Sequence, residues 1–185
     1  MKKENTALYI LRLTVTLLAI CAVVALALAG VNAITKDKIA AIKAEKTQKA
    51  IAAVLPGAEN IAEVAFTDQS GLVAKVYQDA AVGYAVEVAP NGFGGAITMM
   101  VGVSPEGEVL GISIISHAET PGLGAVAAAN TDKGVSFREQ FKGLLAGIGI
   151  GSEGNQIKAI SGATISSKAI VDGVNAALEC IKNMG

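Results

Sequence analysis

The 185-residue sequence contains no tryptophan, one histidine and two cysteines. Two cysteines are too few for a disulfide scaffold or a multi-cysteine zinc or iron–sulfur site, and one histidine adds little to them. Charged residues make up 17% of the chain, below the roughly one quarter of a typical soluble protein. The hydrophobic share of 52% excludes a disordered chain. The length suits one ordinary domain plus an appendage.

The net charge of -1 conceals two oppositely charged parts. Residues 1–55 carry eight Lys/Arg and three Asp/Glu, whereas residues 56–185 carry seven and thirteen. An acidic domain with so few basic residues is a poor binder of phosphate backbones, so nucleic acid is not an expected partner. The basic part adjoins a hydrophobic segment, where attraction to anionic membrane lipid explains it.

The hydrophobic segment is Leu13–Ile34, which contains no charged residue. At 1.5 Å per residue it spans about 33 Å as a helix, enough to cross a bilayer. A secretory signal is the alternative, with Lys2, Lys3 and Arg12 as its basic region. The run is too long for such a signal and lacks a small-residue cleavage site, so we predict a retained anchor. Basic residues lie on both sides of it, and their count leaves the orientation open.

After the anchor, Thr35–Leu55 has helical spacing, abundant alanine and no glycine or proline. Pro56-Gly57 ends this helix, which can be continuous with the anchor. We therefore expect a tail and transmembrane anchor at 1–34, a helical stalk at 35–57 and a folded domain at 58–185.

The first half of the domain is predicted to consist of short strands. These are Ile61–Asp68, Leu72–Gln78, Gly83–Ala89, Ala96–Val103 and Val109–Ser116. Ser104–Gly107 (SPEG) is a turn that joins the last two into a hairpin. The pattern predicts a mostly antiparallel sheet.

The second half mixes loops and helices. We expect a loop-helix stretch at 122–133, a helix near Phe137–Leu145 and a glycine-rich loop at Gly147–Gly154. A short strand, Gln156–Ile160, then precedes a final helix at about Ser166–Lys182. The fold class is therefore α+β.

The segment Ser161–Ser167 (SGATISS) lies between this last strand and helix. A helix N-terminus offers free N–H groups and a partial positive charge, and the hydroxyls add donors, which favours phosphate binding. Serine and threonine are also common there simply as helix caps. Spacing alone leaves both interpretations open.

Two further loops could carry chemistry. His117–Gly124 (HAETPGLG) follows a strand, but it lacks the cysteine partner of zinc deaminases and the nucleophile elbow of hydrolases. A turn is the ordinary interpretation of its proline and glycines. Asn91–Ile97 (NGFGGAI) is followed by a strand, so we expect a β-turn and not a dinucleotide-binding loop.

Taken together and in this order, these motifs resemble the FMN-binding G subunit of Rnf ion-translocating oxidoreductase complexes. The related C subunit of the sodium-translocating NADH:quinone reductase shares much of the pattern. The resemblance covers about residues 8–183, and the compact length favours the Rnf protein. The sequence departs from the family motif at Lys158, where an acidic residue is usual.

The resemblance implies that a separate flavin transferase attaches FMN through its phosphate to the hydroxyl of Thr164. It implies that Ser161, Gly162 and Ala163 shape the turn and that Ser166 and Ser167 lie near the phosphate. The remaining implied cofactor-binding residues line the isoalloxazine ring; they are Glu119, Thr120, Gly122, Leu123 and Gly124. It assigns no chemical step to His117 and no metal ligand.

The resemblance also implies a place and a role. The chain would be a single-pass protein of the cytoplasmic membrane, with its N-terminus inside and its FMN domain outside. It would be one redox stop in a ferredoxin:NAD oxidoreductase that moves Na⁺ or H⁺, with the other Rnf subunits as partners. The alternatives are an FMN carrier of another electron-transfer chain and a membrane-anchored scaffold whose Ser/Thr turn only caps a helix.

Overall fold

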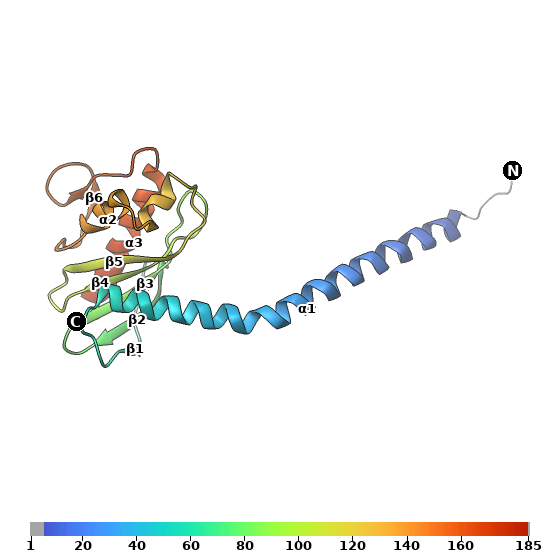
Figure 1. Cartoon of the computed structure of the whole chain (residues 1–185), viewed down its shortest axis with the longest axis horizontal. Coiled ribbons are helices and arrows are strands. Elements are labelled where there is room, and N and C mark those ends of the chain that lie inside the picture. The colour runs from blue at the N-terminus through green and yellow to red at the C-terminus, as the bar shows by residue number, and fades with distance from the viewer. Residues whose placement is uncertain (1–5, 185) are drawn as a thin grey trace. The chain divides into compact units, whose positions relative to one another are not determined.

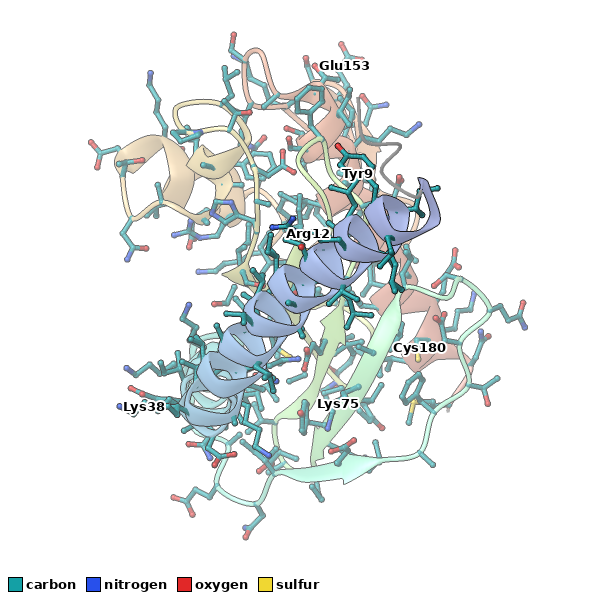
Figure 2. All side chains as sticks on the ribbon, turned by 90° about the vertical axis from the view of Figure 1, so that its right-hand side faces the viewer. Tyr9, Arg12, Lys38, Lys75, Glu153 and Cys180 are labelled. Atoms are coloured by element: carbon teal, nitrogen blue, oxygen red, sulfur yellow. The ribbon has the colours of Figure 1, made fainter. Side chains whose placement is uncertain are left out.

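The computed structural model describes residues 6–184, so Lys2 and Lys3 lie outside the described residues. Helix α1, Thr6–Val54, runs without a break through the hydrophobic segment and most of the segment predicted as a stalk, so the continuity that the sequence left open is observed. Its apolar part is long enough to cross a membrane, and no other helix in residues 6–184 is. Tyr9, Arg12 and Lys38 project outward from α1 (Figure 2).

The chain forms two compact units, residues 1–45 and residues 46–185. The division falls within α1, so the last turns of this helix belong to the folded domain. The helix ends at Val54, and Gly57 adopts a positive φ of 89° in the turn that follows. Pro56 lacks an N–H, so the helix cannot continue through it.

A five-stranded antiparallel sheet forms the centre of the domain, with its strands in sequence order (Figure 1). The strands are β1 Ala62–Val64, β2 Val73–Asp79, β3 Gly83–Val88, β4 Thr98–Val103 and β5 Val109–Ser116. Two short parallel strands, β6 Gly149–Ile150 and β7 Gln156–Ile157, pair with each other in a separate ladder. The predicted α+β class with a mostly antiparallel sheet is confirmed.

Two predicted strands are too long. Beyond β1, the Asp68 carboxylate accepts hydrogen bonds from the amides of Ser70 and Val73, which folds that segment into a turn. Beyond β7, the amide of Lys158 donates to the side chain of Gln140 instead of a neighbouring strand. β6 lies inside the stretch predicted as a glycine-rich loop, because its pairing with β7 is not visible in the spacing of its own residues.

The helices are η1 Gly124–Ala128 (a 3₁₀ helix), α2 Asp132–Glu139 and α3 Thr164–Lys182. The predicted helix at Phe137–Leu145 is wrong. Thr131 caps α2 by accepting from the amide of Gly134, so the helix starts earlier, and Gly143 (φ 74°) lies in the turns after its end. Helix α3 begins two residues before the predicted Ser166.

Both faces of the sheet are covered. Helix α3 packs Ile170 and Val174 against the face that carries Val86 and Val101. The opposite face carries Ala85 and Met100, and the end of α1 covers it. The α1 residues in this contact, with the residue that follows the helix, are Ala50, Ile51, Val54 and Leu55. Each fully buried aliphatic side chain contributes about 1.5–3 kcal/mol, so the α3 layer fixes this helix against the sheet and the α1 layer stabilises the opposite face.

Candidate functional site

The turn into α3 presents the hydroxyl of Thr164 to solvent. Gly162 has a φ of 75°, a conformation that residues with a Cβ rarely adopt, and it reverses the chain just before the helix. The N-cap is Ala163, which has no side chain able to cap. Thr164 is the first helical residue, and within residues 6–184 its exposed hydroxyl forms no hydrogen bond. The Ser/Thr residues of this segment therefore do not cap the helix.

The start of α3 is suited to an anion. The amide N–H groups of Thr164, Ile165 and Ser166 find no acceptor among the described residues. These groups and the dipole of a 19-residue helix place about half a positive charge at this end. The exposed Lys168 follows one turn later on the helix. A phosphate ester on Thr164 would meet these donors directly.

Ser167 holds the turn from within the domain. Its hydroxyl is fully buried, donates to the carbonyl of Ala163 at 2.9 Å and accepts from the amide of Ile160 at 3.0 Å. The bonds connect the residue before the turn to the first turn of the helix. A place for Ser167 near a phosphate stays a prediction, and a direct bond to the phosphate would require these bonds to change. Ser161, by contrast, is exposed.

The loop after β5 meets the same helix end through Glu119. This carboxylate is buried, accepts from the amide of Gly94 at 2.8 Å and accepts a short hydrogen bond from the hydroxyl of Ser166. The Ser161–Ser167, His117–Gly124 and Asn91–Ile97 segments therefore meet at one place. His117 is exposed, and its ring nitrogen accepts from the amide of Glu119, so the histidine helps to shape the loop.

A cavity of about 350 Å³ opens at this meeting point. Most of the predicted site residues line it, namely Glu119, Thr120, Leu123, Gly124, Gly162, Ala163, Thr164 and Ser166. Phe93 and Ile165 line it too, and both were missing from the prediction. Their exposure of 70% and 57% is high for large apolar side chains. The motif containing Phe93 forms the predicted turn, with a bridge between Asn91 and Ala96. A turn motif does not by itself indicate that its residues line a binding site, which is why Phe93 was missed.

A second cavity, of about 640 Å³, lies next along the same two loops. Gly122 and Ser161 line it, and each is the chain neighbour of a residue that lines the first cavity. Its wall includes Val126, Phe137 and Ile160 and two exposed lysines, Lys133 and Lys158. Of the eleven predicted site residues, ten line one of these two cavities, and Ser167 supports them from behind. Within residues 6–184 no cluster of His, Cys, Asp or Glu could hold a metal ion.

Comparison with known proteins shows the family to which the chain belongs. Residues 92–179 match the FMN-binding domain family. The chain is 31% identical over 192 residues to the G subunit of the Na(+)-translocating ferredoxin:NAD(+) oxidoreductase complex of Acetobacterium woodii, and the match covers 95% of this chain and 93% of that protein. The chain belongs to the G subunit family of ion-translocating oxidoreductase complexes.

Two further members of the G subunit family are similar. The G subunit of the ion-translocating oxidoreductase complex of Methanosarcina acetivorans is 32% identical over 182 residues, covering 93% of this chain and 94% of that protein. The G subunit of the proton-translocating ferredoxin:NAD(+) oxidoreductase complex of Clostridium ljungdahlii is 42% identical over 98 residues, and this match covers 53% of this chain and 52% of that protein. The family predicted from the motifs is therefore confirmed.

The residues present fit FMN. The Thr164 hydroxyl and the helix amides, which have no partner among residues 6–184, suit the phosphate. The exposed apolar side chains of Phe93, Leu123 and Ile165 suit a flat aromatic ring. Such side chains are exposed at a cost that a bound ring would remove.

Proposed function

We propose that this chain is the electron-transfer subunit of a membrane-bound Rnf-type ferredoxin:NAD oxidoreductase coupled to Na⁺ or H⁺ translocation, and that it carries FMN covalently on Thr164. One observation supports Thr164 as the attachment site. Its hydroxyl is exposed, forms no hydrogen bond within residues 6–184 and lies at the start of α3. The family match supports the redox role.

The residues around the cofactor have distinct tasks. The amides at the start of α3 receive the phosphate, and Leu123, Phe93 and Ile165 contact the ring and exclude water from one side. Thr120, Gly122 and Gly124 shape the loop that carries Leu123. FMN supplies the electron transfer itself, and the protein supplies orientation and tuning of its potential.

Attachment needs an activated flavin, which we propose is a phosphoanhydride of FMN used by the flavin transferase. Thr164 would supply its hydroxyl oxygen to the flavin phosphorus as the anhydride bond breaks. The other half of the anhydride, a nucleotide, would be the leaving group, and the hydroxyl proton would pass to the transferase. The covalent bond prevents loss of the cofactor from a domain that faces water.

We propose a single-pass topology, with residues 1–34 as tail and anchor, 35–57 as a stalk whose last turns pack on the sheet, and 58–185 as the FMN-binding domain. The N-terminus lies in the cytoplasm and the FMN domain outside the cytoplasmic membrane. The partners are membrane lipid around α1, the other proteins of the complex and, during assembly, the transferase. The long apolar stretch of α1 supports the anchor.

Mass spectrometry tests the attachment. Trypsin cleavage after Lys158 and Lys168 releases a peptide, residues 159–168, that contains Thr164 and three serines. We expect this peptide from the native host to carry the mass of FMN minus water, and fragmentation to place it on Thr164 and not on Ser161, Ser166 or Ser167.

Two substitutions sharpen the result. Thr164→Ala removes the hydroxyl and should abolish the flavin, whereas Ser161→Ala, at an exposed neighbour, should retain it. Wild-type protein that carries no flavin although the transferase is present would overturn the proposal and favour a scaffold role. Flavin on a serine would overturn the assigned position.

A further inference from the structure

Glu119 lies where three separate chain segments meet. One carboxylate oxygen accepts from the amide of Gly94 at 2.8 Å, and the other accepts from the hydroxyl of Ser166, which is 47 residues away in sequence. The side chain is 6% exposed and lines the 350 Å³ cavity beside Thr164. Glu119 is thus a buried acid in the wall of the flavin site.

The surrounding chain leaves room for this carboxylate. A Cβ on Gly92 would lie 2.4 Å from one of its oxygens, and a Cβ on Gly124 would lie 2.4 Å from the other. Neither distance is possible between non-bonded atoms, so a side chain at either position would displace the carboxylate. The two glycines therefore belong to the same arrangement as the acid.

Glu119 is a carboxylate without a cationic partner in the part of the chain that the structure describes. No lysine or arginine among the residues that the structure describes forms an ion pair with Glu119, and its two partners are a neutral amide and a neutral hydroxyl. Both partners donate, which suits an acceptor-only carboxylate. A buried charge without a counter-ion acts at longer range than an exposed one, because solvent screens it less.

We propose that the negative charge of Glu119 lowers the midpoint potential of the FMN, with Ser166 setting how much of that charge the flavin experiences. The inference rests on the proposed attachment of FMN at Thr164. Reduction adds negative charge to the flavin, and a nearby buried carboxylate opposes it. Glu119 is therefore a positioning and tuning residue that acts through the charge it holds beside the ring.

The test uses the full-length flavinylated protein and two variants of opposite expected effect. Glu119→Gln keeps the shape and removes the charge; Ser166 can then accept from the amide NH₂ instead of donating. We expect flavin loading to remain. At a fixed solution potential the ratio of reduced to oxidised flavin should rise at least tenfold, which corresponds to a midpoint potential about 30 mV higher for a two-electron couple. Ser166→Ala keeps the charge but removes a donor, so the potential should fall.

A matched control separates tuning from stability. Asp79 is also a buried carboxylate that binds loop amides, but it lies at the β2–β3 turn and lines none of the cavities described above. Asp79→Asn should lower stability and leave the flavin potential unchanged.

The outcomes are distinct. A loaded Glu119→Gln protein with the wild-type potential overturns the inference, as does a Ser166→Ala potential that rises. If Glu119→Gln does not fold, the direction of the Ser166→Ala shift decides alone. Absence of flavin from the wild type instead overturns the proposed function, and this inference with it.

Discussion

Gly102 of β4 lies directly against the main-chain carbonyl of Val54 at the end of α1. A Cβ built on Gly102 would be 2.4 Å from that oxygen. The end of the helix can therefore reach the sheet only because this position has no side chain. Beside this contact, buried Leu55 and Met100 belong to one cluster that joins the end of α1 to the flavin-binding domain.

Gly102→Ala should lower the free energy of unfolding by about 1–3 kcal/mol, because the added methyl forces α1 and β4 apart. Chemical denaturation of the detergent-solubilised protein measures it. The matched control is Gly111→Ala, at the cross-strand partner in β5, where the nearest atom to a Cβ is the Lys142 Cε at 3.8 Å. Equal losses in the two variants would contradict the close contact as the cause.

Ser167→Ala should lower the free energy of unfolding by about 1–3 kcal/mol, because the amide of Ile160 loses its acceptor. The same change should loosen the turn before Thr164, so hydrogen exchange at Ile160 should accelerate. Ser161→Ala, at an exposed position in the same turn, should change stability by less than about 0.5 kcal/mol. An unaltered stability in Ser167→Ala would show that the turn does not depend on this hydroxyl.

Asp79 should make stability depend on pH at the acidic end. Hydrogen bonds from the backbone amides, of Ala81 first and then Asn60, lower the pKa of its carboxyl below the ordinary value. A lowered folded-state pKa gives a contribution that is fully present above the unfolded pKa of about 3.9 and is lost as the pH falls through the folded value.

Urea denaturation of the wild type and Asp79→Asn at pH 7 and at pH 3 measures this contribution. The stability difference between the two proteins should be larger at pH 7 and smaller at pH 3. Glu153→Gln serves as the control, because Glu153 is exposed and forms no hydrogen bond or ion pair within residues 6–184. A difference that is the same at both pH values would contradict the assignment.

Cysteine labelling should report the topology. Glu153 projects from the loop between β6 and β7 (Figure 2), and Glu153→Cys should react with a membrane-impermeant maleimide in intact spheroplasts. The native background should be low, because Cys180 is buried and Cys21 lies in the proposed membrane segment. Glu4→Cys should react only after lysis. The reverse pattern would place the domain in the cytoplasm.

Much of the fold could be predicted from local patterns. Leu13–Ile34 has no charge, and the following residues keep helical spacing, so two adjoining helices could be predicted and their continuity was left open; the structure shows one helix. The strand Val109–Ser116 was predicted with its observed bounds. The helix α2 was misplaced because its start depends on the Thr131 cap, a weak signal beside the spaced hydrophobic residues of the 137–145 segment.

The long apolar helix, the strand-rich domain and the motif that contains Thr164 can all be read from the amino-acid order, because each depends on neighbouring residues. Three other features become visible only in the folded domain: Glu119 bonds Gly94 and Ser166, Phe93 joins the cavity, and Ser167 supports the turn. The contacts of Glu119 and Phe93 join segments that are far apart in sequence, so they depend on how the sheet, its loops and α3 pack, which residue spacing along the chain does not encode. The bonds of Ser167 span only four and seven residues, but they form on a side chain that packing of α3 buries.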